Sequence, residues 1–222
     1  MTRPLTHTEE NYLKAIYKAN EKTKTAVNTN TIAAYMNTSA ASVTDMIKKL
    51  ALKELVIYER YKGARLSPTG SKTATSVIRK HRLWETFLVQ KLGFSWEEVH
   101  EIAEELEHIN SDKLISKLDE YLGFPKYDPH GDPIPSADGK FMLREQMILS
   151  QLNIDETGIL VGVKNHETSF LSHLNNLNIA LGSAIRIIAR SEFDKSLKVS
   201  VSEGAEVVLT DMVAKNLLIR KT

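Results

Sequence analysis

The chain has 222 residues, of which 42% are hydrophobic and 26% are charged, and it contains no cysteine. This composition is ordinary for a globular protein, and the length allows two or three small domains. The lack of cysteine excludes disulfides and thiolate metal ligands, and it fits a reducing compartment such as the cytoplasm. No run reaches the roughly 20 apolar residues that cross a bilayer, and the first residues do not resemble a secretory signal. We therefore expect a cytoplasmic protein that has no membrane partner.

The net charge of +1 hides a segregation of charge along the chain. Residues 1–82 hold 15 Lys or Arg against 6 Asp or Glu, whereas residues 83–145 hold 6 against 14. The last 77 residues are balanced, with 8 of each. A basic first third indicates a polyanionic partner, and an acidic middle is where cations would gather.

The first 66 residues predict three helices and a hairpin. Apolar residues recur at helical spacing from Tyr12 to Tyr17, behind Thr6 or Thr8 as a possible N-cap. A second, short helix opens at residues 28–31, and Ser39 follows a tight turn as the N-cap of a third. Residues 55–61 and 64–66 have the strand, glycine turn and strand of a hairpin. This order is that of a winged helix-turn-helix, although a plain three-helix bundle with a surface hairpin would also give it.

In a winged helix-turn-helix the second helix of the pair enters the major groove of DNA. We expect the start of the third helix to offer small or hydrogen-bonding groups to base edges and the hairpin to contact phosphates or the minor groove. The predicted base-reading residues are Ser39, Ala41, Ser42, Thr44 and Asp45. The predicted hairpin contacts are Arg60, Tyr61, Lys62 and Arg65.

The middle of the chain predicts a helical region. One long helix is expected from Thr69 to about Leu92, and a capping-box pattern at Ser95–Glu98 starts the next. Residues 110–112 cap a further helix that runs to Tyr121. Four of the six prolines then cluster between Pro125 and Pro135, which indicates a loop over residues 122–141.

The last part of the chain changes to a strand-rich texture. A short helix is expected near residues 142–151. Short apolar strands follow, with one helical insert at residues 170–176. Several short strands within about 65 residues predict a small barrel. The expected strands are 158–163, 184–188, 197–201, 207–209 and 217–219.

The run from Val99 to His108 contains the residues with the clearest chemistry. His100, Glu104, Glu107 and His108 are separated by four, three and one positions, so one α-helix brings them to one face. Two imidazoles and two carboxylates are ligands for a divalent cation. An acidic solvated helix with incidental histidines is the alternative. The pair His81 and Glu85 on the preceding helix favours the metal site.

These motifs, in this order, resemble the diphtheria-toxin-repressor family of metal-dependent bacterial transcription regulators over nearly the whole chain. The resemblance is carried by Glu10–Tyr17, the helix-turn-helix and hairpin, Ser67–Gly70, Arg79–Leu83, the run ending at His108, and Pro129–Pro135. It implies a winged helix-turn-helix, a helical dimerisation domain and a C-terminal SH3-like barrel. The expected bounds are 1–72, 73–142 and 150–222.

The resemblance also implies two metal sites. A regulatory site matches Glu104, Glu107 and His108 together with Asn11 from the first helix. An ancillary site matches His81, Glu85 and His100, with His166 or Glu167 as candidates to complete it from the C-terminal domain. Asp128 and His130 match ligand positions of some manganese-responsive relatives.

Two positions distinguish this chain within the family that it resembles. Iron-responsive relatives carry cysteine at the position of Glu104, so an all-oxygen and imidazole set favours Mn²⁺ over Fe²⁺. Asn11 stands where relatives carry methionine or aspartate. Lys14 replaces a glutamate of the short manganese-responsive members, which argues against a closely paired arrangement of metals.

The sequence therefore predicts a homodimeric regulator that is not an enzyme, activated by Mn²⁺, with Fe²⁺ as the alternative. It would repress metal-uptake genes from a pseudo-palindromic site on double-stranded DNA. A winged-helix regulator with a non-metal effector is one rival. A dinuclear carboxylate enzyme is another, but its two Glu-x-x-His motifs, ending at His100 and His108, share one predicted helix instead of facing each other.

Overall fold

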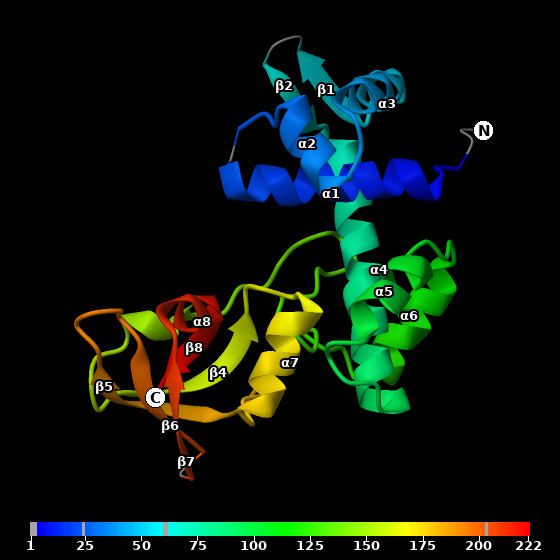
Figure 1. Ribbon diagram of the computed structural model, residues 1–222. Helices are drawn as coiled ribbons and strands as arrows, with labels where there is room; N and C mark the ends of the chain where they lie inside the picture. Colours follow the sequence, from blue (N-terminus) through cyan, green and yellow to red (C-terminus); the bar gives the residue numbers. More distant parts are fainter. Residues whose placement is uncertain (1–3, 24, 60–61, 203) are drawn as a thin grey trace. The chain divides into compact units, whose positions relative to one another are not determined.

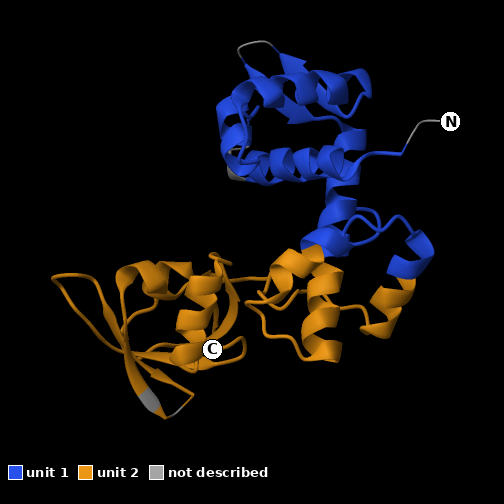
Figure 2. Ribbon diagram, turned by 45° about the vertical axis from the view of Figure 1, so that its right-hand side comes forward, with its two compact units in different colours: residues 1–81, 104–115, 135–141 blue, residues 82–103, 116–134, 142–222 orange. Residues whose placement is uncertain are grey.

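The computed structural model describes residues 4–23, 25–59, 62–202 and 204–222 (Figure 1). The chain divides into two compact units, coloured separately in Figure 2. The first unit comprises residues 1–81, 104–115 and 135–141. The second comprises residues 82–103, 116–134 and 142–222. Among the described residues no helix is both long and apolar enough to cross a bilayer.

The first unit contains the predicted three helices and hairpin: α1 (His7–Thr23), α2 (Thr29–Tyr35), α3 (Ala40–Leu52), β1 (Val56–Glu59) and β2 (Gly63–Leu66). Thr6 is the residue that caps α1. Its hydroxyl accepts a hydrogen bond from the Glu9 amide, and its own amide donates to the Glu9 carboxylate. Asn28 caps α2 and Ser39 caps α3 through their side-chain oxygens.

A single apolar core holds these elements together. Leu13 and Ile16 of α1, Ile32 of α2 and Ile47 and Leu50 of α3 are all fully buried in it. Burial of each such side chain contributes about 1.5–3 kcal/mol, so α1 is bound firmly to the helix-turn-helix. Any force that moves α1 therefore also moves α3.

The hairpin turns at a position that requires glycine. Gly63 has a φ of +104°, and a Cβ there would lie 2.4 Å from the Val27 carbonyl oxygen. The close approach allows Val27 and Ala64 to exchange backbone hydrogen bonds of 2.8 Å, which fastens the hairpin beside α2.

Three helices follow, and the boundary between the two units crosses each of them: α4 (Pro68–Leu92), α5 (Val99–Leu106) and α6 (Asp112–Tyr121). The long α4 and the Ser111-capped α6 were both predicted. The helix of the metal run is shorter than expected. It ends at Leu106, and Glu107 and His108 lie in the turn that follows.

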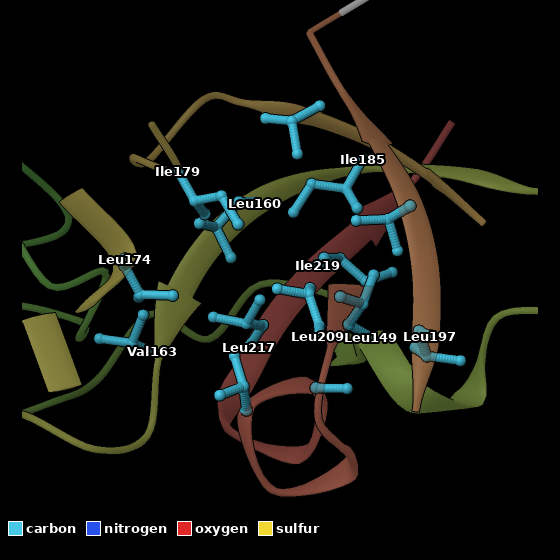
Figure 3. Packing of buried hydrophobic residues seen from close by; sticks show 14 of the residues in the cluster. Leu149, Leu160, Val163, Leu174, Ile179, Ile185, Leu197, Leu209, Leu217 and Ile219 are labelled. Carbon is cyan, nitrogen blue, oxygen red and sulfur yellow. The ribbon is translucent and has the colours of Figure 1, made fainter. Parts of the chain in front are cut away.

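The C-terminal part of the second unit is a six-stranded antiparallel sheet of order β3-β8-β4-β5-β6-β7. Figure 3 shows Leu160, Ile185 and Ile219 of neighbouring strands pointing into one core. The strands are β3 (Met147–Ile148), β4 (Thr157–Val163), β5 (Ala184–Arg190), β6 (Leu197–Val201), β7 (Ala205–Leu209) and β8 (Leu217–Lys221). Two helices accompany them, α7 (Thr168–Asn176) and α8 (Asp211–Asn216).

One predicted element is wrong. The helix expected at residues 142–151 is absent from this described stretch. In its place stand the strand β3 and a 3-10 turn, η1 (Leu149–Gln151). Met147 pairs with Ile219 of β8, so contacts with a distant strand override the local helical preference. The strand β3 and the helix α8 were not predicted.

Candidate metal centres and nucleic-acid interface

The start of α3 presents the predicted base-reading residues. Ala41, Ser42 and Asp45 are exposed, as a groove-entering helix requires. Ser39 and Thr44 are already used locally, because Ser39 caps the helix and Thr44 donates to the Ala40 carbonyl. The cap at Ser39 was predicted, and the predicted DNA contacts of both residues stay predictions.

Two of the four predicted hairpin contacts lie among the described residues. Lys62 and Arg65 are exposed, and Lys62 pairs with Glu59 at 2.7 Å. Arg60 and Tyr61 lie outside the described residues. Exposed cations on a hairpin beside a helix-turn-helix are suited to phosphate contacts.

The first unit gathers a cluster of ionisable side chains, here called the first cluster: Glu10, Lys14, His81, Glu104, Glu107 and His108. Glu107 lies at its centre and is fully buried. Its Oε1 is 2.5 Å from the Lys14 ammonium and its Oε2 is 2.7 Å from His81 Nδ1. Lys14 also lies 2.8 Å from Glu104.

His108 is held in one orientation by α1. Its Nδ1 lies 2.5 Å from Glu10 Oε2, and its ring stacks on that of His7 with centroids 4.3 Å apart. Its Nε2 faces Glu107 Oε1 at 3.8 Å. A carboxylate on one ring nitrogen leaves the other for a cation, which is the usual arrangement behind metal-binding histidines.

Asn11 lies on the same stretch of α1 as Glu10 and Lys14. Its Oδ1 is buried and accepts no hydrogen bond within the part of the chain that the structure describes. A buried amide oxygen without a partner costs about 1–3 kcal/mol, which a cation would recover. The donor set of Asn11, Glu104, Glu107 and His108 therefore fits a divalent metal ion of the harder kind.

Within the second unit Glu85, Asp128 and His130 bring one ligand atom each to within 4.8 Å of one another. All three are buried. We call them the second cluster. His100 Nδ1 lies 3.3 Å from Glu85 Oε1, and His130 Nδ1 lies 3.7 Å from Glu85 Oε2.

Electrostatics indicate that negative charge is in excess around the second cluster. Burial, aided by the charges of Glu85 and Asp132, raises the pKa of Asp128 to about 7 against the opposing effect of Arg82. Burial alone would lower the pKa of His130, but Glu85, Asp128 and the Trp96 carbonyl raise it to about 9. Crowded carboxylates in a buried site are relieved by a cation.

The loop that carries Asp128 and His130 is fastened on several sides within this unit. His130 Nε2 lies 2.8 Å from the Trp96 carbonyl oxygen, and the His130 carbonyl accepts from the Val163 amide of β4 at 3.0 Å. Arg144 donates to the Gly131 carbonyl at 2.7 Å and to the Val161 carbonyl, while its guanidinium lies 3.9 Å from the centre of the Tyr127 ring. The second cluster is therefore preorganised.

The two candidates from the C-terminal part behave differently. The His166 ring stacks on His130 with centroids 4.7 Å apart, and burial lowers the pKa of His166. Glu167 is exposed at the residue before α7. Of the two, the structure brings His166 toward the second cluster.

Two members of the first cluster were not predicted as site residues. Glu10 and Lys14 lie one turn apart on α1, beside Asn11. Their helical spacing around a candidate ligand was the available signal. His81, expected beside Glu85, contacts Glu107 in the first unit.

The helical region exposes large apolar side chains. Leu92 is 56%, Tyr121 is 64% and Phe124 is 56% exposed. Apolar side chains that stay in solvent at these fractions are typical of a surface that a partner covers. This agrees with a dimerisation role for the region.

Comparison with protein families divides the chain into three consecutive matches. Residues 4–64 match the iron dependent repressor, N-terminal DNA binding domain. Residues 67–136 match the iron dependent repressor, metal binding and dimerisation domain, and residues 147–221 match the FeoA domain. The three matched regions correspond, in chain order, to the helix-turn-helix with its hairpin (the DNA reader), the helical region and the six-stranded sheet.

Some known proteins match over nearly the full chain. The diphtheria toxin repressor of Corynebacterium diphtheriae is 27% identical over 99% of both chains. That of Corynebacterium jeikeium is 34% identical over 61% of this chain, and the match spans 56% of the relative's length. A solved structure described as a manganese-dependent transcriptional repressor complex with manganese is 35% identical, with a TM-score of 0.85 over 96% of this chain and 100% of the other.

These matches confirm the predicted fold: a winged helix-turn-helix, a helical dimerisation domain and an SH3-like C-terminal domain. They also confirm that the protein is a regulator and not an enzyme. Its partners are DNA, a divalent metal ion and a second copy of the chain. The chain belongs to the diphtheria-toxin-repressor family of metal-dependent, DNA-binding transcriptional repressors.

Proposed function

We propose that this chain is a cytoplasmic repressor of metal-uptake genes and that Mn²⁺, with Fe²⁺ as the alternative, activates it through Asn11, Glu104, Glu107 and His108. The observation that carries the proposal is the Oδ1 atom of Asn11, which is buried without a hydrogen-bond partner among the described residues. Asn11 lies on α1 beside Glu10 and Lys14 of the first cluster. The donor set holds only oxygen and imidazole nitrogen. Such a set suits Mn²⁺ better than a softer ion. The similar manganese-dependent repressor supports the same choice.

Asn11 and the first cluster would connect metal binding to DNA binding. Asn11, Glu10 and Lys14 belong to α1, which packs against α2, α3 and β2 of the reader. Glu104, Glu107 and His108 come from the end of α5 and the turn after it. A bound cation would supply the positive charge that joins the two sets of ligands. Fixing α1 in this way would favour one arrangement of α3, the helix that contacts DNA. The metal site and the DNA-binding site would then be linked by a coupling free energy.

The second cluster would hold a further cation with Glu85, Asp128 and His130, and with His100 beside them. Because its loop is hydrogen-bonded to β4, we assign this cation a stabilising role for the second unit. The mutual separation of Glu85, Asp128 and His130 supports this assignment. Glu167 is a weaker candidate ligand than His166.

The dimer would place two copies of α3 on a pseudo-palindromic operator, with half-sites about 34–36 Å apart or a multiple of this distance. The exposed Leu92, Tyr121 and Phe124 support a dimer formed through the helical region. The predicted residues at the start of α3 would contact base edges, and Lys62 and Arg65 would contact phosphates. Arg60 and Tyr61 remain predictions.

The test is operator binding by fluorescence anisotropy, titrated with Mn²⁺, Fe²⁺ under anaerobic conditions, and buffer alone. We expect Mn²⁺ to raise the affinity for the operator and to leave the affinity for a scrambled duplex almost unchanged. Equal operator affinity with and without either ion would refute the proposal. An unchanged melting temperature on adding metal would favour a non-metal effector, because a ligand that binds the native state stabilises it.

A further inference from the structure

The ammonium group of Lys14 occupies a buried position among residues proposed as metal ligands. Its Nζ lies 2.8 Å from Glu104 Oε1 and 2.5 Å from Glu107 Oε1. The Lys14 side chain is 8% exposed and that of Glu107 is 0% exposed. Both ion pairs join α1 to residues about 90 positions away in the chain. A buried lysine is held in such a place only when carboxylates compensate its charge.

Lys14 uses the same carboxylate oxygen that faces the histidine of the site. Glu107 Oε1 lies 2.5 Å from Lys14 Nζ and 3.8 Å from His108 Nε2, while Oε2 lies 2.7 Å from His81 Nδ1. A cation that binds between Glu107 and His108 must therefore share Oε1 with the ammonium or displace it. Lys14 lowers the net negative charge that the first cluster offers to a metal ion.

We infer that Lys14 is a tethered cation that bridges Glu104 and Glu107, stabilises the metal-free protein and sets the metal affinity of the first cluster. This inference rests on the proposed function, because it assumes that these carboxylates bind metal. The lysine holds the two carboxylates together before any ion arrives. The lysine thereby preorganises the site but lowers its affinity for a metal ion. It also limits the negative charge that a second metal ion could use beside the first one.

The charges predict the direction of each effect. Without the ammonium, Glu104 and Glu107 are neighbouring carboxylates, and Glu107 is fully buried. Removing one partner of a buried ion pair destabilises a protein strongly, because the other charge is left uncompensated. A divalent ion then meets two carboxylates with no competing cation, so its affinity rises.

The experiment compares Lys14→Met with Lys14→Arg in a background where His130→Ala disables the second cluster. The control is Lys53→Met. Lys53 pairs at 2.7 Å with Glu9, which lies on the same helix as Lys14. Among the described contacts Lys53 has none with Glu104 or Glu107. The readouts are the melting temperature without metal and the Kd for Mn²⁺ measured by electron paramagnetic resonance. Neither readout depends on DNA binding.

We expect Lys14→Met to lower the metal-free melting temperature more than Lys53→Met does and to tighten the Kd for Mn²⁺ by about ten-fold or more. Lys14→Arg, which keeps the charge, should stay near the parent Kd. If Lys14→Met does not fold, the double variant Lys14→Met/Glu104→Gln removes one charge of each sign and carries the same test. It should bind Mn²⁺ more tightly than Glu104→Gln alone.

An unchanged Kd in Lys14→Met, with a loss of stability no greater than that of Lys53→Met, would overturn the tethered cation and leave the proposed metal site intact. A parent protein that binds no Mn²⁺ in the His130→Ala background would overturn the proposed regulatory site and this inference with it. A weakened Kd in Lys14→Met would likewise overturn the inference, since it would make Lys14 a support of metal binding instead of a competitor.

Discussion

Glu10 Oε2 lies 2.5 Å from His108 Nδ1, so a carboxylate of α1 fixes the imidazole ring of the turn after α5. The pair is buried on both sides. It leaves Nε2 of His108 directed toward Glu107. The ring orientation needed by a metal ligand is therefore set by the element that belongs to the DNA reader.

Replacing Glu10 by Ala is expected to weaken Mn²⁺ binding at the first cluster by about 10–100-fold, the usual cost of losing the carboxylate behind a histidine ligand. Glu10→Gln should lose less, because an amide oxygen still accepts the Nδ1 proton. Isothermal titration calorimetry with Mn²⁺ measures both. Glu9→Gln serves as the neighbouring control, since Glu9 pairs with Lys49 and Lys53. Equal affinities for all three variants would remove Glu10 from the site.

Replacing Asp128 by Ala should abolish the stabilisation that a cation gives through the second cluster. In the wild type, Mn²⁺ at 100 times its Kd adds about 2.7 kcal/mol of stability per site that binds only the native state. Thermal unfolding with and without Mn²⁺ should show a smaller shift in Asp128→Ala. The exposed His173→Ala on α7 is the control. A shift equal to that of the wild type would show that Asp128 does not bind the ion.

Charge removal on the hairpin should weaken DNA binding without changing sequence preference. Lys62→Ala and Arg65→Ala each remove one exposed cation, and each should reduce the slope of log affinity against log salt by about 1. Ser42→Ala, on the exposed start of α3, should instead lower the ratio of operator to scrambled affinity. Lys198→Ala in the C-terminal sheet is the control. A hairpin variant with an unaltered slope would contradict the predicted phosphate contact.

Acid should weaken the C-terminal sheet where β4 and β8 meet. Hydrogen bonds from Lys221 and from Asn153 lower the pKa of Glu156 from 4.5 to about 2. A group whose pKa is lowered on folding stabilises the protein above its unfolded pKa and loses that effect as pH falls toward the folded one. The melting temperature of the wild type should therefore be higher than that of Glu156→Gln at pH 6. The difference between the two melting temperatures should be smaller at pH 3. A gap that widens on acidification would contradict the ion pair.

Local signals in the sequence predicted most of the fold. The caps at Asn28 and Ser39 and the glycine turn at Gly63 each act within a few residues, so the helix-turn-helix and hairpin were found. The strand β3 was missed because it has two residues and exists only by pairing with β8. Elements defined by distant partners leave no periodicity to detect.

The metal sites stay predictions, and the structure adds contacts among the candidate residues that the sequence did not indicate. Candidate ligands such as Glu104 and His108 are recognisable by their spacing in the sequence. Their partners are not, because Glu10 is 98 positions from His108 and Lys14 is 93 positions from Glu107. Which carboxylate meets which histidine depends on how α1 packs. Helical spacing alone does not specify this packing.

The central claim is that metal binding through Asn11 activates operator binding. The most direct test is the operator affinity of wild type, Asn11→Ala and Asn11→Asp, measured by fluorescence anisotropy over a Mn²⁺ titration. We expect Asn11→Ala to need much more Mn²⁺ for half-activation and Asn11→Asp, which adds a charged oxygen, to need less than the wild type. All three should bind the operator equally in the absence of metal. Identical Mn²⁺ titration curves for the three proteins would contradict the account.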